Sequence, residues 1–396
     1  MEILFISSIT PSPTNNGAAS ALPFHLLSYR MEGINVTIYS FNANKVSDED
    51  ISMVQKMLRC RVHLIKYPDW ARYAAKLLPL RILMRYPYSN YLRLPKTVAK
   101  KIRRTKPDGI WVYGEELSRV VKQFPESKRV HTMPDCESLY YKRMLQQRFV
   151  QENKIRYWRN RIMWPKYRRM ERRMEDDPSV RYHLVGQADV EEFNTINPRA
   201  QAHFIRHPHY DVAEPAKEIR FARPRIRLVV AGRHDLYMTQ TADEVTDALC
   251  QAGDLQQQYV ITFLGKGWEY TAARLIRQGY EVSIIPFAPD YKAELVRHDI
   301  QVTPITIGTG TKGKVLDALA NGLLVIGTPY AIENIAVTDG VSCRIFDTAQ
   351  QCLEILRDIP DNIKRYEAIA EQGRQAVLDN HGRDAVAEQF FNLFRL

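Results

Sequence analysis

The stretch Thr303–Thr328 reads TPITIGTGTKGKVLDALANGLLVIGT and decides the expected fold. An apolar strand ends near Pro304, a loop of alternating glycine and threonine follows, and a helical pattern begins near Lys312. A second apolar run, LLVIG, comes directly after the helix. Strand, tight loop, helix and strand in close succession are typical of a parallel α/β sheet. We therefore predict an α/β domain around this stretch.

The loop between the first strand and the helix has the chemistry of an anion site. Glycines let backbone N–H groups approach a ligand closely, and a helix start adds unpaired donors and partial positive charge. Such a site suits a diphosphate, and a carboxylate one turn into the helix suits two ribose hydroxyls. A turn that only packs the helix on the sheet is the alternative, but threonines, lysines and a carboxylate converge on this helix end. The predicted contacts are Gly308, Thr309, Gly310, Thr311, Lys312, Lys314 and Asp317.

The whole chain contains two α/β series separated by a proline-rich stretch. Its 396 residues suit two domains. Residues 208–224 hold three prolines and little periodicity, which indicates a linker between domains at residues 1–207 and 225–396. Both domains are expected to be Rossmann-like, and the last helix is a candidate to pack back on the first. The predicted strands are Ile3–Ser7, Asn35–Phe41, Gly109–Tyr113, Arg129–His131, Tyr182–Val185, Ile226–Ala231, Val260–Leu264, Val282–Ile285, Ile300–Thr303, Leu324–Ile326 and Cys343–Phe346.

Composition narrows the class of protein. The chain is 45% hydrophobic and 26% charged, as in globular proteins. Its five cysteines are scattered and never form a CxxC pair, which argues against a disulfide framework and a zinc site. The start of the chain has no basic leader, and no apolar run approaches the roughly 20 residues of a membrane-spanning helix. We therefore expect a cytoplasmic protein, or one peripheral on the cytosolic face of the inner membrane.

Residues 308–335, GTGTKGKVLDALANGLLVIGTPYAIENI, resemble the nucleotide-binding segment of retaining glycosyltransferases of family four. The resemblance implies the GT-B fold, in which two Rossmann-like domains face each other across a cleft, and a nucleotide-sugar donor held mainly by the C-terminal domain. It extends more weakly to the first loop, to LVVAGRHD and to SIIPFAPDYKAEL. These matches, and the Glu-Gly pair that many members carry, imply donor contacts at Gly17, Arg233, Phe287 and Glu333.

Two departures from the family pattern concern the donor site. Members carry two glutamates with seven residues between them, whereas this chain has Thr309 and Asp317 at those positions. Family members also commonly carry a lysine shortly after the arginine that corresponds to Arg233, and this chain lacks it. Lys312 and Lys314 are expected to take over its phosphate contacts. The identity of the sugar is therefore open, and a catalytically silent relative that only binds a nucleotide sugar is an alternative.

Near the expected reaction centre, RVHTMPDCESLYY places His131 and Asp135 just past a short strand. Ligands of open α/β sheets bind beyond the carboxyl ends of strands, so His131 is a candidate catalytic residue and Asp135 or Glu137 a candidate acceptor ligand. A loop histidine with only local hydrogen bonds is the alternative. In the resembled family the leaving diphosphate helps to activate the acceptor, which implies no protein nucleophile, no metal and no cofactor besides the donor.

The net charge of +11 is uneven along the chain. Residues 1–210 hold 36 basic and 20 acidic residues, and two stretches, 66–106 and 142–173, mix basic with aromatic side chains. Such surfaces suit anionic lipid headgroups, which would bring a polyprenyl-diphosphate-linked acceptor to the enzyme. A solvated basic face with the aromatic residues in the core is the alternative. A nucleic-acid-binding protein is the rival from another class, but no recognised nucleic-acid module is present and none is expected as a partner. The predicted activity is transfer of a sugar from a UDP- or GDP-sugar to a glycan or lipid-linked acceptor, in surface polysaccharide biosynthesis.

Overall fold

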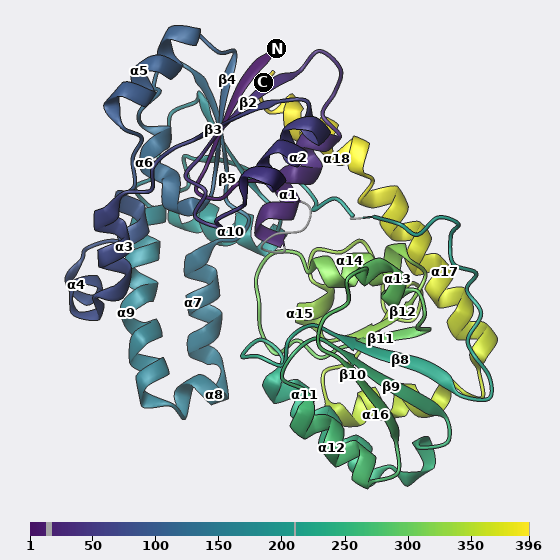
Figure 1. Ribbon diagram of the computed structural model, residues 1–396. Helices are drawn as coiled ribbons and strands as arrows, with labels where there is room; N and C mark the ends of the chain where they lie inside the picture. The colour runs from purple at the N-terminus through teal and green to yellow at the C-terminus, as the bar shows by residue number, and fades with distance from the viewer. Residues whose placement is uncertain (13–17, 210, 396) are drawn as a thin grey trace. The chain divides into compact units, whose positions relative to one another are not determined.

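The computed structural model describes residues 1–12, 18–209 and 211–395, which fold into two compact units (Figure 1). One unit comprises Met1–Pro208 and Arg383–Leu396, and the other comprises His209–Gly382. Each is an open, parallel α/β sheet covered by helices. The predicted α/β class is thus confirmed in both halves of the chain.

The sheet of the first unit has seven parallel strands in the order β3-β2-β1-β4-β5-β6-β7. The central strands β1 and β4 are continuous apolar runs because helices cover both faces of the sheet, whereas β5 (KRVHT) and β6 (VRYHL) also carry polar residues. The edge strands β3 and β7 were not expected, since they are short, polar and partly exposed, and their backbone pairing alone defines them. The strands are β1 (Glu2–Ser7), β2 (Asn35–Ser40), β3 (Arg61–Leu64), β4 (Gly109–Tyr113), β5 (Lys128–Thr132), β6 (Val180–Leu184) and β7 (Gln201–Phe204).

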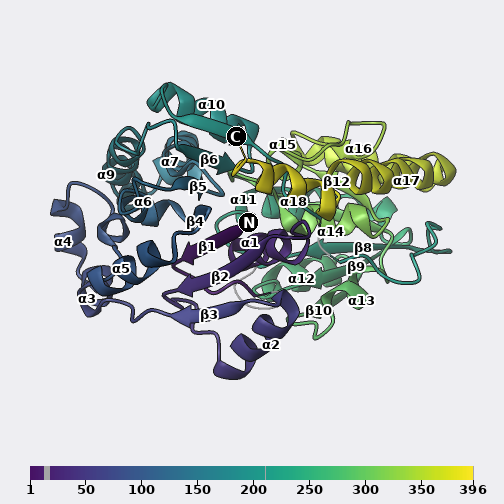
Figure 2. The same ribbon diagram turned by 90° about the horizontal axis from the view of Figure 1, so that it is seen from above.

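Two separate apolar cores lie on the two faces of this sheet. Helix α18 (Arg383–Asn392) belongs to one of them, alongside α1 (Figure 2), and its Phe390 ring packs 4.4 Å from Trp111 of β4. The chain therefore returns to the first unit after completing the second. The other helices of this unit are α1 (Ala18–Ser28), α2 (Asp48–Leu58), α3 (Asp69–Lys76), α4 (Leu78–Leu83), α5 (Lys96–Thr105), α6 (Ser118–Val121), α7 (Glu137–Gln146), α8 (Arg148–Gln151), α9 (Lys154–Glu171) and α10 (Gln187–Ile196).

The second unit has six parallel strands in the order β10-β9-β8-β11-β12-β13. Helices α11 and α12 lie on one side of the sheet and α13 and α14 on the other (Figure 1). The strands are β8 (Ile226–Ala231), β9 (Tyr259–Leu264), β10 (Glu281–Ile285), β11 (Ile300–Thr303), β12 (Leu324–Gly327) and β13 (Arg344–Ile345). The helices are α11 (Thr239–Gln251), α12 (Glu269–Arg277), α13 (Tyr291–Leu295), α14 (Gly313–Ala320), α15 (Pro329–Ile332), α16 (Ala349–Asp358) and α17 (Ile363–Asn380).

The stretch expected as a linker packs on the second unit over its described residues. Phe221 is buried in the core, and the Ala213 N–H donates to Asn321 Oδ1 at 2.8 Å. Lys217 and the Ala222 N–H reach the buried carboxylate of Asp299, at 3.7 and 3.1 Å. The partners in these contacts lie far along the chain. The composition of the stretch, from which a linker was predicted, therefore could not indicate them.

Candidate functional site

The carboxyl ends of β8 and β11 form the switch point of the second sheet. The chain runs from β8 to β9 and β10 on one side, then crosses to β11 on the other side of β8. Open α/β sheets bind ligands in the crevice outside such a point. The loops that follow the two strands are joined there, because the Thr306 N–H donates to the Tyr237 carbonyl at 2.7 Å. This places the loop singled out in the sequence at the expected edge of the sheet.

Lys314 lies over the turn that follows β8. A Cβ atom on Gly232 would collide with the Lys314 ammonium, and Gly232 has a φ of 121°, so only glycine fits here. Within the described ranges, the acceptor at hydrogen-bond distance from Lys314 Nζ is Met238 Sδ, a weak one, at 3.5 Å. Burial lowers the pKa of Lys314, and the carboxylate of Asp235 acts in the opposite direction. The geometry therefore holds an ammonium in a confined place without a strong anionic partner.

Lys312 makes a different set of contacts. Its Nζ donates to the carbonyls of Thr309 and Gly310, at 2.6 and 3.0 Å. Asn334 Nδ2 also donates to the Gly310 carbonyl, at 3.0 Å. We call residues 308–311 the glycine loop. Lys312 braces this loop from inside, whereas Lys314 extends from α14 toward the turn after β8.

The first turn of α14 presents backbone donors next to these lysines. Helix α14 begins at Gly313, and its N-cap residue Lys312 makes no side-chain capping bond. The first N–H groups of a helix have no partner within the helix and carry partial positive charge. Thr311 is buried and Thr309 is partly exposed in the loop before them. Backbone donors and the Lys314 ammonium together favour a diphosphate ligand.

Asp317 lies deep in the unit but keeps part of its surface open. Burial, followed by the charge of Asp211, raises the pKa of Asp317 well above its usual range. Burial raises the pKa of the Tyr291 phenol in α13, and the charge of Asp317 acts in the same direction. A buried carboxyl next to another acid gains from hydroxyl donors, which a ribose would provide.

The remaining predicted donor residues are spread over other loops of the second unit. Arg233 is exposed directly after the β8 turn, and Phe287 is 75% exposed in the loop after β10. Glu333 follows α15 and precedes Asn334, whose bond to Gly310 ties this turn to the glycine loop. Gly17 lies outside the described residues. The structure brings Lys314, the glycine loop and Glu333 into one region, and it leaves Phe287 on a separate exposed loop.

His131 lies within β5, as the predicted strand Arg129–His131 implied, and not in the loop past it, because the strand pairs as far as Thr132 with β4 and β6. Its side chain is fully buried, and its Nε2 lies 2.9 Å from the Gly114 carbonyl. Burial lowers the pKa of His131 to about 4, so the ring is neutral at physiological pH. The histidine therefore supports the turn after β4.

A group of four carboxyls lies where β4 and β5 end. Burial, followed by the charges of the neighbouring acids, raises the pKa of Glu115 well above its usual range. Burial also raises the pKa of Glu116, whose carboxylate accepts a hydrogen bond from the Ser8 hydroxyl. Asp135, and Glu137 at the start of α7, complete the group, and all four side chains are partly open. Glu115 and Glu116 were missed in the sequence, although two acids directly after the strand GIWVY were a usable signal.

Glu137→Gln should flatten the pH dependence of stability in the first unit. Burial, with the charge of Asp135, raises the pKa of Glu137 to about 8. A raised carboxyl pKa means that the folded protein holds a proton which the unfolded chain releases, so stability falls as pH rises from about 4.5 to about 8. The slope is at most about 1.4 kcal/mol per pH unit, and glutamine, which resembles the protonated carboxyl, removes it.

Urea unfolding of wild type and variant between pH 5 and pH 9 measures this difference. Glu126→Gln is the matched control, because Glu126 is an exposed acid of the same unit, paired with Arg103 at 3.3 Å. We expect Glu126→Gln to keep the wild-type slope. If Glu137→Gln kept the wild-type slope, the raised pKa would not belong to Glu137.

The described parts of the chain contain neither a metal-binding cluster nor a membrane-spanning helix. Over residues 1–12, 18–209 and 211–395, no group of three or more histidine, cysteine or acidic side chains is arranged to hold a metal ion. Within the same ranges, no helix is both long and apolar enough to cross a bilayer.

Comparison with known proteins agrees with this fold. Residues 244–392 match the family model described as "Glycosyl transferase-like". No curated protein matches the chain in sequence. Among solved structures, HepE from Anabaena in complex with UDP is similar over all of both chains, with a TM-score of 0.65 and 13% identity.

Two further solved structures share the fold. Sucrose-phosphate synthase from Thermosynechococcus elongatus has a TM-score of 0.65 and 12% identity, over all of this chain and 98% of that one. WaaG, a glycosyltransferase involved in lipopolysaccharide biosynthesis, has a TM-score of 0.63 and 13% identity, over all of this chain and 99% of that one. The chain thus has the GT-B fold, and the family match supports a glycosyltransferase.

Proposed function

We propose that this chain is an enzyme that transfers a sugar from a UDP- or GDP-sugar to a glycan or lipid-linked acceptor. The observation that carries the proposal is the Lys314 ammonium over Gly232, beside the uncapped start of α14 and at the switch point of the sheet. Retention of configuration, independence of metal and a role in surface polysaccharide biosynthesis are parts of the same proposal. They rest on the resemblance of residues 308–335 to retaining enzymes.

The comparisons support a nucleotide-sugar donor. The similar protein HepE was solved with UDP and with UDP-glucose. WaaG acts in lipopolysaccharide biosynthesis, which favours a surface glycan as the acceptor class. Of UDP and GDP, the two nucleotides left open by the sequence, the ligands of HepE favour UDP.

The donor contacts follow from the chemistry of each group. The start of α14, Lys314 and Arg233 would bind the diphosphate and stabilise the negative charge that builds on it as the sugar leaves. Asp317 would accept hydrogen bonds from the ribose, and Phe287 would cover the base. Gly17, the threonines of the glycine loop and Glu333 are proposed donor contacts by resemblance. Asp135, with its neighbouring carboxyls, is proposed to bind acceptor hydroxyls, while His131 holds the turn at Gly114 from which Glu115 and Glu116 follow.

A thermal-shift screen with UDP, GDP, ADP, CMP and their sugar conjugates tests the proposal. A ligand at about 100 times its dissociation constant adds about 2.7 kcal/mol to the stability of the folded state. We expect a selective rise in melting temperature with one nucleoside diphosphate, and turnover with one of its sugars. Binding without turnover would identify a silent relative, and no shift with any nucleotide would refute the donor site.

Asp317→Ala should weaken binding of the selected nucleotide about tenfold or more. Each hydrogen bond between Asp317 and a ribose hydroxyl contributes about 0.5–1.5 kcal/mol, so two of them account for the loss, since tenfold corresponds to about 1.4 kcal/mol. Calorimetric titration with the nucleotide and with its 2′-deoxy form locates the contact. Wild type should prefer the ribose form, and Asp317→Ala should bind both forms equally. An Asp317→Ala variant that kept the wild-type preference would show that another group binds the ribose.

A further inference from the structure

Helices α3, α4 and α9 of the first unit expose large apolar side chains. The exposed fractions reach 83% for Leu83 and Ile155, and 61% for Trp158. Exposed apolar groups that are clustered mark interaction surfaces. We call the following six residues the apolar set: Trp70, Tyr73, Leu78, Leu83, Ile155 and Trp158.

The attachment of α4 explains why its apolar side chains stay outside. Helix α4, with the sequence LPLRIL, has no buried residue. The buried Lys166 of α9 donates to the carbonyls of Arg81 and Ile82, at 2.6 and 2.7 Å, and Arg169 donates to the Arg85 carbonyl at 2.9 Å. The end of α4 is thus held through its backbone by basic side chains. Most protein helices pack through an apolar face, so this one is left with that face unused.

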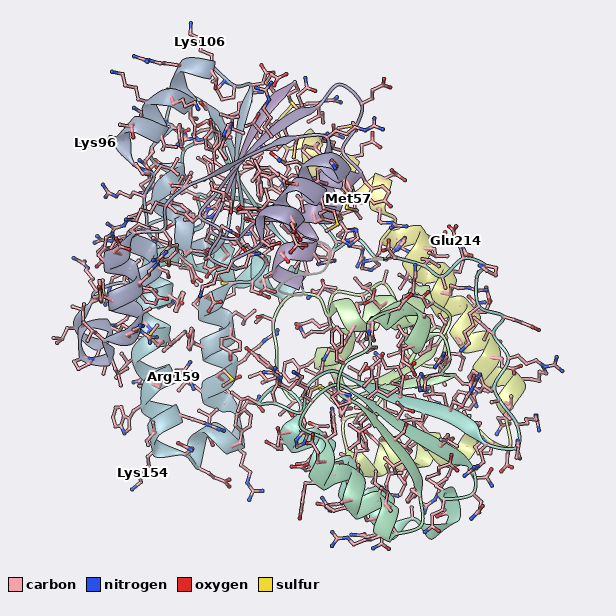
Figure 3. All side chains as sticks on the ribbon, in the orientation of Figure 1. Met57, Lys96, Lys106, Lys154, Arg159 and Glu214 are labelled. Carbon is pink, nitrogen blue, oxygen red and sulfur yellow. The ribbon has the colours of Figure 1, made fainter. Side chains whose placement is uncertain are left out.

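The same helices are strongly basic. Residues 66–85 hold five basic residues and one acid, Asp69, and residues 142–173 hold twelve basic residues and two acids. Asp69 pairs with Lys66 and Arg72, at 3.2 and 3.5 Å, in solvent-exposed contacts. Lys154 and Arg159 are both exposed, and Figure 3 shows them on α9, with Lys154 near α8. Cationic charge around exposed apolar groups is complementary to an anionic lipid surface.

We propose that α3, α4 and α9 form a docking surface for an anionic lipid bilayer, with the apolar set entering the headgroup region. The aliphatic members favour lipid over nucleic acid, because single strands stack on aromatic rings, whereas Leu78, Leu83 and Ile155 provide none. Acyl chains accept leucine, isoleucine and tryptophan alike. This surface lies in the first unit, so the inference goes beyond the proposed donor chemistry and does not depend on it.

Cosedimentation with vesicles of phosphatidylcholine, with and without phosphatidylglycerol, tests the surface. Wild type should bind only the vesicles that contain phosphatidylglycerol. The double variant Leu78→Ser/Leu83→Ser should bind them at least tenfold more weakly, because burial of one leucine alone accounts for about tenfold. Met57→Ser is the matched control, since Met57 is 54% exposed on α2, apart from these helices (Figure 3). We expect Met57→Ser to bind as wild type does.

Charge variants separate the electrostatic part of binding. Lys154→Gln/Arg159→Gln should weaken binding severalfold, and the loss should shrink at high salt. Lys96→Gln/Lys106→Gln removes the same charge from α5, away from α9 (Figure 3), and should have a smaller effect. All these substitutions are at exposed positions, and the thermal shift with nucleotide should be unchanged in each variant.

Two outcomes would overturn the docking surface. The first is wild-type binding to anionic vesicles by Leu78→Ser/Leu83→Ser, or no vesicle binding by wild type at all. The second is binding of a random oligonucleotide that competes with the vesicles and is insensitive to the two leucines. Neither outcome bears on the donor site, because nucleotide binding is measured separately in the thermal-shift screen.

Discussion

Lys314→Met should lower turnover with the nucleotide-sugar donor about 100- to 1000-fold. The loss of one preorganised donor to a developing negative charge costs about this much in other enzymes. Lys314 fits that role because its ammonium is confined over Gly232, with Met238 Sδ as its hydrogen-bond acceptor among the residues described. Methionine keeps most of the packing of the stem, so the variant tests the charge and not the fold. The readout is kcat/KM for the sugar donor, with the melting temperature of the free protein as a check on folding.

Lys312→Met is the comparison for this variant. The Lys312 ammonium is already bound to the carbonyls of Thr309 and Gly310, so its loss should loosen the loop and raise the donor KM about tenfold. Equal effects of the two variants would show that neither lysine has a special relation to the diphosphate. Unchanged turnover in Lys314→Met would refute the proposed role of Lys314.

Asp299→Ala should destabilise the second unit by about 3–5 kcal/mol, the usual cost of removing one partner of a buried ion pair. The Asp299 carboxylate is fully buried and accepts hydrogen bonds from Arg227 Nε and Nη2, at 3.1 and 2.7 Å. It also accepts from the backbone of Arg227 and Ala222, at 3.0 and 3.1 Å. The Asp299 side chain, just before β11, thus connects residues 208–224, which were predicted to be a linker, to β8.

The substitution also isolates the ammonium of Lys217. Burial lowers the pKa of Lys217 to about 8, and the charge of Asp299 raises it against that effect. Without Asp299 the pKa of Lys217 should fall further, and the backbone donors of Arg227 and Ala222 would lose their acceptor. Asp254→Ala is the matched control, because Asp254 pairs with Arg357 at 2.7 Å on the surface and should contribute less than about 1 kcal/mol.

Denaturant unfolding of the whole chain measures the loss of stability in Asp299→Ala and in Asp254→Ala. Trp268, which is fully buried, is the tryptophan of the second unit, so a variant in which the other four are replaced by phenylalanine, used as the common background, reports the transition of this unit by fluorescence. A loss of less than about 1 kcal/mol in Asp299→Ala would contradict the structural role of Asp299. A similar loss in both variants would mean that burial does not distinguish the two carboxylates.

The sequence determined the features that depend on near neighbours in the chain. The alternation of buried apolar strands and helices predicted both α/β units, because a strand covered on both faces is apolar throughout. The glycine loop and the start of α14 at Gly313 could also be predicted, because the residues that form a tight turn and a helix start lie within about ten positions of one another. The resemblance of residues 308–335 to a known family also suggested roles for individual side chains. Those roles remain predictions.

Only the tertiary structure decided the features that depend on distant parts of the chain. The edge strands β3 and β7 form because a partner offers its backbone, so their own side chains carry no strong signal. His131 ended a predicted strand and was a candidate to face a ligand, yet it pairs with Val112 and Tyr182 inside β5 and is fully buried. Lys312 and Lys314 look equivalent in sequence, and the fold alone makes Lys312 a brace of the loop and places the Lys314 ammonium over Gly232, with the weak acceptor Met238 Sδ. Burial and the partner of a polar group are set by segments that meet only after folding, and for that reason the sequence located the site while the tertiary structure distinguished its residues.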